Sequence, residues 1–183
     1  MASPLEALQS LGRAVMLPIA VLPAAGLLLR LGHPDLLDIP FIAAAGEAIF
    51  ANLGLLFAAG VAVGLARDNN GAAGLAGVVC FLIATKGAET LLHVPAEALK
   101  GMAGDAAGLA TAAFKEKAIA KVSVPIGIIS GVIGGQFYNR FSNVKLPEYL
   151  AFFGGRRFVP VVAGLAGLVA GAFVGFTYRT PGM

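Results

Sequence analysis

The feature that most constrains this chain is a series of five apolar runs, each long enough to cross a lipid bilayer as a helix. A spanning helix needs about 20 mostly apolar residues, and charged residues or Pro and Gly separate the runs. The sequence therefore predicts an all-α integral membrane protein with about five transmembrane helices. We expect the spans at Ala14–Leu31, Phe41–Ala66, Gly71–Leu92, Val122–Tyr138 and Phe158–Tyr178.

The composition favours lipid over water as the solvent. Of the 183 residues, 58% are hydrophobic and 13% are charged, whereas soluble domains carry about 25% charged residues. The net charge is only +3 and its cations are scattered, which argues against nucleic acid as a partner. Cys80 is the single cysteine and lies in an apolar run, so we expect a buried, inert thiol and no multi-cysteine metal site.

The first apolar run resembles a signal peptide only superficially. Arg13 precedes the run, but no convincing cleavage site followed by a soluble domain comes after it. We therefore expect a retained helix. Pro18 and Pro23 lie inside it, and because proline removes a backbone hydrogen bond, the helix should be kinked.

Glycines recur at four-residue spacing in three of the runs. Such rows form grooves in which helix backbones approach closely. The partner in each groove is either another helix of this chain or a second copy of the protein, and the sequence leaves both interpretations open. The rows are Gly60 and Gly64; Gly127, Gly131 and Gly135; and Gly167, Gly171 and Gly175.

Two segments between the runs carry most of the charge. Pro95–Lys121 is Ala-rich with partly helical apolar spacing, and fits either an amphipathic helix on the membrane surface or a solvated loop. Asn139–Arg157 carries four cations against Glu148, an excess that favours a basic cytoplasmic loop. With five spans, the N-terminus is then cytoplasmic. The whole-chain count does not decide this orientation, because it places six cations inside and seven outside.

The sequence contains no Walker phosphate loop, no HExxH motif and no paired cysteines, so we expect neither a complete catalytic site nor a cofactor. His33 and His93 lie at the ends of apolar runs and are interpreted as loop residues. Ionisable residues within the runs are more informative, because a charge in hydrocarbon is costly and usually faces a cavity or a partner. These residues are Arg13, Glu47, Lys86 and Glu89.

Lys86 is the strongest of these candidates on physical grounds, because it interrupts the third run. Pairing with Glu89, one helical turn away, would neutralise it without any functional role. Arg13 either extends its side chain to the interface or faces a polar cavity. Glu47 lies early in the second run, where it would sit at the depth of the lipid head groups.

Two distinctive strings resemble the membrane subunits (EIIC) of bacterial sugar phosphotransferase systems of the glucose/N-acetylglucosamine family. The first is Leu11–Gly26, LGRAVMLPIAVLPAAG, and the second is Lys145–Pro160, KLPEYLAFFGGRRFVP. Within that family, Leu31–Leu37 and Gly46–Leu53 look more like N-acetylglucosamine transporters than glucose transporters. Leu92–Lys121 looks longer than its counterpart in the members that the chain otherwise resembles.

The resemblance implies import of N-acetylglucosamine, or glucose, with concomitant phosphorylation. In such systems the membrane subunit binds sugar outside, moves a transport domain against a scaffold, and presents the sugar to a phosphocysteine on a cytoplasmic EIIB domain. The first five spans form the scaffold and dimer interface, and the second half supplies the main sugar-binding residues. Residues 1–183 would then be the scaffold half, working in the bacterial inner membrane as a homodimer with EIIB and the C-terminal half of EIIC.

The same resemblance implies roles for four basic residues. Arg13 and Lys86 match basic residues of the family and would reach the sugar pathway from the scaffold side. Arg156 and Arg157 would dock EIIB, unless they serve only as a positive-inside anchor. The sugar-binding Thr-Glu-Pro motif is missing, and Cys80 lacks the setting of a phosphorylated cysteine.

A second interpretation is a small stand-alone membrane channel, or an assembly partner of another carrier, without phosphotransferase function. It would use the glycine rows for assembly. The final residues, after Phe176, do not look like a domain boundary, so truncation or a frameshift is a further expectation.

Overall fold

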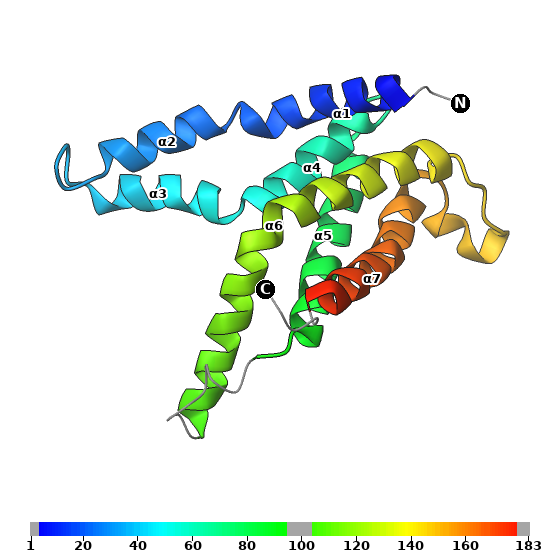
Figure 1. Ribbon diagram of the computed structural model, residues 1–183. Coiled ribbons are helices and arrows are strands. Elements are labelled where there is room, and N and C mark those ends of the chain that lie inside the picture. Colours follow the sequence, from blue (N-terminus) through cyan, green and yellow to red (C-terminus); the bar gives the residue numbers. More distant parts are fainter. Residues whose placement is uncertain (1–3, 95–103, 179–183) are drawn as a thin grey trace.

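The computed structural model describes residues 4–94 and 104–178, and within these ranges all regular secondary structure is helical. Four helices, or five if one bent pair is counted as a span, are long and apolar enough to cross a membrane. This confirms the expected all-α, multi-pass architecture (Figure 1). The helices are α1 (Pro4–Ile19), α2 (Leu22–Leu31), α3 (Pro40–Ala51), α4 (Leu53–Leu65), α5 (Gly71–Leu91), α6 (Asp105–Phe141) and α7 (Phe158–Tyr178), with short 3₁₀ turns η2 (Glu148–Phe153) and η3 (Gly155–Arg157).

The first span is interrupted where the prolines predict. Helix α1 ends at Ile19 and α2 begins at Leu22, yet Leu8–Leu31 is apolar enough to act as one 24-residue span. Pro18 and Pro23 flank the break, and neither has an N–H to donate to the helical ladder. The expected kink is confirmed, although the helix begins at Pro4, well before the predicted Ala14.

The second span differs from the single helix expected over Phe41–Ala66. It consists of α3 and α4, which meet at Asn52 with a bend of 58°. The Asn52 side chain donates its Nδ2 hydrogen to the Ala48 carbonyl oxygen at 2.8 Å. Asparagine competes with the helical ladder in this way, and the apolar pattern around it did not reveal the break.

The fourth span continues a helix that begins much earlier than Val122. Helix α6 has 37 residues and is therefore about 55 Å long at 1.5 Å per residue, well above the roughly 30 Å of a bilayer core. Its charged first part extends away from the bundle (Figure 1). Residues 105–121 are thus helical, and the solvated-loop interpretation is wrong for them. Residues 95–103 lie outside the described ranges.

The glycine rows are filled by helices of the same chain. A Cβ atom on Gly167 would lie 2.7 Å from the Cys80 carbonyl oxygen, and one on Gly135 would lie 2.8 Å from Leu65 Cβ. Helix α7 therefore packs directly on α5, and α6 packs on α4. Helix α1 packs on Gly60 and Gly64 of α4. The rows accordingly give no support to a stand-alone assembly surface. Cys80 is fully buried, as predicted.

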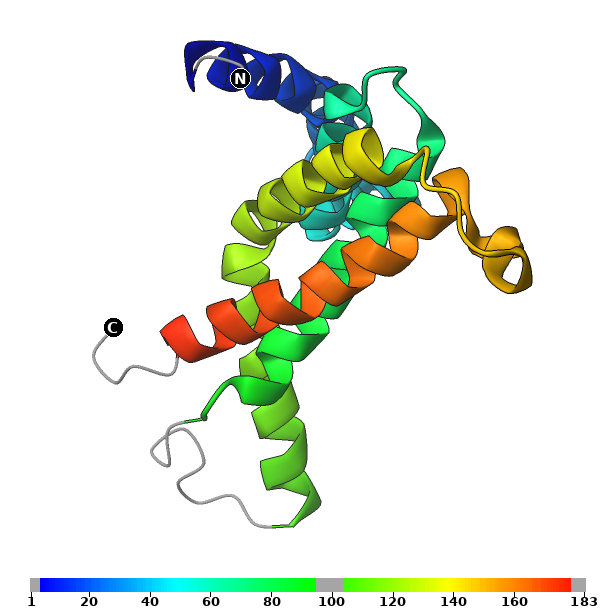
Figure 2. The same ribbon diagram turned by 90° about the vertical axis from the view of Figure 1, so that its right-hand side faces the viewer.

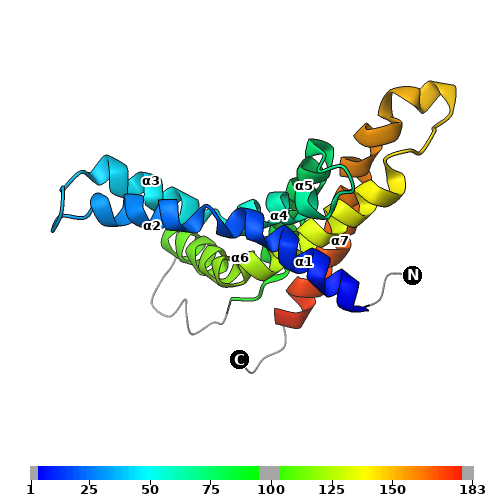
Figure 3. The same ribbon diagram turned by 90° about the horizontal axis from the view of Figure 1, so that it is seen from above.

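Helices α4 to α7 form the core, with α5 in contact with the other three. Helix α1 crosses α4, and the α2–α3 pair projects away from the core (Figures 1 and 3). The start of α1, the turn of residues 66–70 and the segment of residues 142–157 lie toward one end of the bundle (Figure 2). The ends of α5 and α7 lie toward the other. The Asn139–Arg157 region therefore shares an end with the α4–α5 turn.

Candidate functional site: a polar cluster at one end of the bundle

The α4–α5 turn, the end of α6 and η3 meet at one carboxylate. The Tyr138 hydroxyl donates to Asp68 Oδ2 at 2.9 Å, and Arg156 Nη2 donates to the same oxygen at 3.3 Å. Tyr138 is only 3% exposed, whereas the side chains of Asp68 and Arg156 are partly open to solvent. The ion pair is therefore screened, and the buried tyrosine gives the cluster its fixed geometry.

Asn139, next in the chain, closes the end of α4. Its Nδ2 donates to the Leu65 carbonyl oxygen and its Oδ1 accepts from the Arg67 backbone N–H, both at 2.9 Å. The last carbonyls of a helix have no partner within that helix, so this side chain acts as a cap supplied by another element. Gly135, one turn earlier on α6, allows the backbones to come close enough for these bonds.

Two rows of residues on α6 explain why neighbouring side chains reach different elements. Gly127, Gly131, Gly135 and Asn139 face α4, because each of the three glycines would place a Cβ against that helix. The row shifted by one residue, Ile126, Ser130, Gly134 and Tyr138, is buried. A Cβ on Gly134 would meet the Gly77 backbone nitrogen of α5 at 2.5 Å. Spacing of four residues keeps each row on one face of the helix.

A polar pocket of about 200 Å³ opens at the cluster. The Asp68 carboxylate already accepts hydrogen bonds within it, so the pocket presents arginine, amide and hydroxyl groups rather than a free acid. Within the described residues, no group of three or more His, Cys, Asp or Glu side chains has the arrangement of a metal site. The pocket lining is Arg67, Asp68, Tyr138, Asn139, Ser142, Asn143 and Arg156.

Arg156 and Arg157 point to different partners. Whereas Arg156 binds Asp68, the Arg157 guanidinium carbon lies 4.8 Å from the centroid of the Phe152 ring, and its Nη1 reaches the Phe152 carbonyl oxygen at 3.5 Å. Both side chains belong to the basic loop predicted from the sequence. Reasoning from sequence missed Asp68, Tyr138 and Asn139, and the only available signal was the polar string Arg67–Asn70 between two apolar runs.

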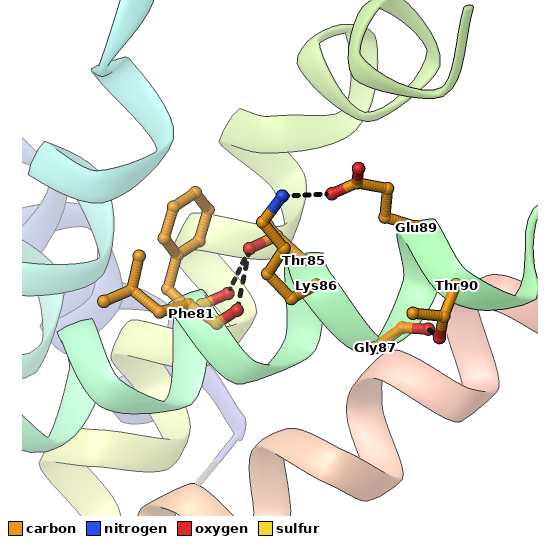
Figure 4. Close-up of polar contacts among 7 residues, drawn as sticks. Phe81, Thr85, Lys86, Gly87, Glu89 and Thr90 are labelled. Atoms are coloured by element: carbon orange, nitrogen blue, oxygen red, sulfur yellow. Dashed lines mark hydrogen bonds and ion pairs between the residues drawn. The ribbon is translucent and has the colours of Figure 1, made fainter. Parts of the chain in front are cut away.

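Lys86 forms an ion pair with Glu89, as expected if the pair only neutralises the charge. Its Nζ lies 2.7 Å from Glu89 Oε2, one turn further along α5 (Figure 4). The lysine side chain is 79% exposed and the glutamate side chain 27%. Nearby, the Thr85 hydroxyl donates to the Phe81 carbonyl at 2.8 Å. The third span therefore exposes a neutralised charge pair near its end, flanked by threonines whose hydroxyls are satisfied by their own helix.

Arg13 lies far from Lys86. Its neighbour Ala14 packs on Gly64, close to the α4–α5 turn, whereas Lys86 lies 15 residues into α5, about 22 Å from the start of that helix. Arg13 itself is exposed, and so is Glu47 on α3. Arg13 thus lies toward the polar-cluster end of the bundle. The structure does not bring the two candidate pathway residues together.

Comparisons with known proteins identify the family. Residues 12–179 match the family described as "Phosphotransferase system, EIIC". The chain is 45% identical over 170 residues to the N-acetylglucosamine-specific EIICBA component of Escherichia coli (strain K12), covering 93% of this chain and 22% of that protein.

Two Bacillus subtilis (strain 168) proteins are similar at comparable levels. The N-acetylglucosamine-specific EIICB component is 40% identical, over 95% of this chain and 33% of its own length. The glucosamine-specific EIICBA component is 43% identical, over 94% of this chain and 25% of its own length. The chain thus spans between about a fifth and a third of these relatives. Its match across nearly the whole sequence shows that the chain belongs to the EIIC family of phosphotransferase system membrane components.

Proposed function

We propose that this chain is the scaffold part of a transporter that imports and phosphorylates N-acetylglucosamine, with glucose as the second candidate sugar. The observation that carries the proposal is the 40–45% identity to relatives named as specific for N-acetylglucosamine. The motif at Leu11–Gly26, apart from Leu11, and the basic loop before α7 fall inside the matched region. One relative is named for glucosamine, a related amino sugar.

The packing of the core supports a scaffold role. Glycines at the α4–α6 and α5–α7 contacts leave no room for a Cβ atom, so the backbones of these helices pack closely against one another. A rigid unit of this kind is suited to stay fixed while a separate domain moves. We infer that the mobile partner is the second, sugar-binding half of an EIIC domain.

We place the polar-cluster end in the cytoplasm of a bacterial cell, facing a phosphorylated EIIB domain. The support is the dense cluster of four cations in Asn139–Arg157, which follows the positive-inside tendency in an inner membrane. The N-terminus is then cytoplasmic as well. Arg157 and Arg156 contribute to EIIB docking, with Arg156 held in place by Asp68. The cations at this end are Arg13, Arg67, Arg140, Lys145, Arg156 and Arg157.

Lys86 and Arg13 would then act at different points of the sugar pathway. Lys86 lies toward the outer end, where its ammonium group and the Glu89 carboxylate offer a donor and an acceptor for sugar hydroxyls. Arg13 lies toward the inner end.

We further propose a homodimer, for which α7 offers an exposed apolar row of Leu165, Val169 and Phe173 to lipid or to a second copy.

A chimera tests the function. The 170 matched residues of the Escherichia coli EIICBA component would be replaced by this chain, in cells lacking their own amino-sugar transporters. We expect uptake and phosphorylation of radiolabelled N-acetylglucosamine, with less activity on glucose. A chimera that inserts correctly, judged by protease accessibility, but phosphorylates neither sugar would refute the proposal.

The chain alone, with soluble phosphocarriers, should be inactive; activity would refute the scaffold assignment.

A further inference from the structure

A second polar recess lies beside the cluster, between the ends of α4 and α6. It is shallow and open to solvent, with a volume of about 410 Å³, and is lined by Arg67, Gln136, Asn139 and Arg140. Gln136 and Arg140 are one turn apart on the same face of α6. The lining thus combines two guanidinium groups and two carboxamides without a carboxylate. We call it the Arg67–Arg140 recess.

The two arginines are exposed, and within the described part of the chain they are among the cations that have no carboxylate partner. Arg30, Lys86 and Arg156 each have a carboxylate within 4 Å. Over residues 4–94 and 104–178, Arg67 and Arg140 make no ion pair. Two like charges that converge on one recess repel each other unless an anion is present between them.

Helix ends alone do not account for this convergence. A cation near a helix C-terminus interacts favourably with the helix dipole, which explains one arginine at the end of each helix. The Leu65 carbonyl of α4, however, already accepts a hydrogen bond from Asn139. The same asparagine holds the Arg67 backbone N–H and so sets where the Arg67 side chain begins. The recess is therefore built by a tertiary contact rather than by two independent helix ends.

We propose that the Arg67–Arg140 recess binds a phosphate group presented at the membrane surface. Guanidinium groups match phosphate oxygens in a bidentate geometry, and Gln136 adds a neutral donor. Arg140 is in the last turn of a spanning helix and Arg67 lies two residues after α4 ends, so both stand at the depth of lipid head groups. Basic pockets between spanning helices are suited to anionic head groups. This inference is independent of sugar transport.

The test uses the purified 183-residue chain in neutral detergent with native mass spectrometry and thermal unfolding. The probes are short-chain phosphatidylglycerol, short-chain phosphatidylcholine and inorganic phosphate. The variant is Arg67→Gln with Arg140→Gln. The matched control is Arg30→Gln, which removes an exposed arginine outside the recess. Loss of two charge-assisted contacts should weaken phosphatidylglycerol binding by about tenfold or more.

The outcomes separate the two sources of phosphate. Phosphatidylglycerol binding that exceeds phosphatidylcholine binding, falls in the double variant and persists in Arg30→Gln supports the site and assigns it to a lipid. Binding of inorganic phosphate with the same dependence on the two arginines, and equal in strength to phosphatidylglycerol, supports the site and assigns it to free phosphate. Equal binding of both lipids, or binding unchanged in the double variant, overturns the proposal.

Discussion

The Tyr138 hydroxyl donates a 2.9 Å hydrogen bond to Asp68 Oδ2 and so joins the end of α6 to the α4–α5 turn, across 70 residues of sequence. Arg156 reaches the same oxygen from η3. Two hydrogen bonds between residues distant in sequence therefore share one acceptor and join three elements.

Replacing Tyr138 with Phe removes the hydroxyl while keeping the ring. Asp68 would then rely on a partly exposed arginine, so we expect the free energy of unfolding to fall by about 1 kcal/mol or less. Denaturation by SDS in mixed micelles, followed by helical circular dichroism, measures this. Tyr149→Phe is the matched control, because Tyr149 is 83% exposed. Equal effects of the two substitutions would show that the Asp68 contact contributes nothing.

Gly167→Ala tests the α5–α7 contact. The added Cβ would lie 2.7 Å from the Cys80 carbonyl oxygen, and overpacking of this kind costs about 1–3 kcal/mol. Gly26→Ala on α2 is the control, since no atom lies within 4 Å of its added Cβ. It should be neutral or stabilising because alanine favours helix. The same SDS denaturation applies, and a stable Gly167→Ala protein would contradict the packing described.

Lys86→Gln distinguishes a role in the sugar pathway from simple neutralisation by Glu89. The lysine is largely exposed, so stability should change little. In the chimera, we expect sugar uptake to fall with the amount of inserted protein unchanged. Lys117→Gln, an exposed lysine in the charged part of α6, is the control. Uptake that is unaffected by Lys86→Gln would show that Lys86 only pairs with Glu89 and has no role in the sugar pathway.

Arg156→Ala and Arg157→Ala test docking. With phosphorylated EIIB supplied as a separate protein, we expect the KM for EIIB to rise severalfold and its salt dependence to weaken, because surface charges mainly guide association. The kcat for sugar phosphorylation should not change. Arg30→Ala is the control outside the basic loop. Reduced insertion or reversed topology, with an unchanged KM, would instead identify the two arginines as a positive-inside anchor.

The α2–α3 turn should respond to acid. Arg30 Nη1 donates to both Asp35 carboxylate oxygens, at 2.7 and 2.8 Å, and this bond holds the Asp35 pKa below its ordinary value of 3.8. The stabilisation is therefore complete above about pH 3.8 and is lost as the pH falls through the lowered pKa. A carboxyl titration by NMR measures the pKa of Asp35. Arg30→Gln should return the pKa toward 3.8, and an unchanged pKa would exclude Arg30 as the cause.

The amino-acid sequence by itself determined the membrane class, the positions of most spans, the break near Pro18 and Pro23, and the burial of Cys80. These properties are local, because apolar length and missing N–H groups act wherever they occur along a chain. It also indicated which helices pack closely, through the glycine rows, without naming the partner helix.

Tertiary structure decided the rest. It assigned the Gly167 row to α5 and the Gly135 row to α4, and it bent the second span at Asn52. It also brought Asp68, Tyr138 and Arg156 to one point. The physical reason is that a hydrogen bond or a close backbone contact depends on distance in space, and residues 70 to 88 positions apart meet only after the helices have packed.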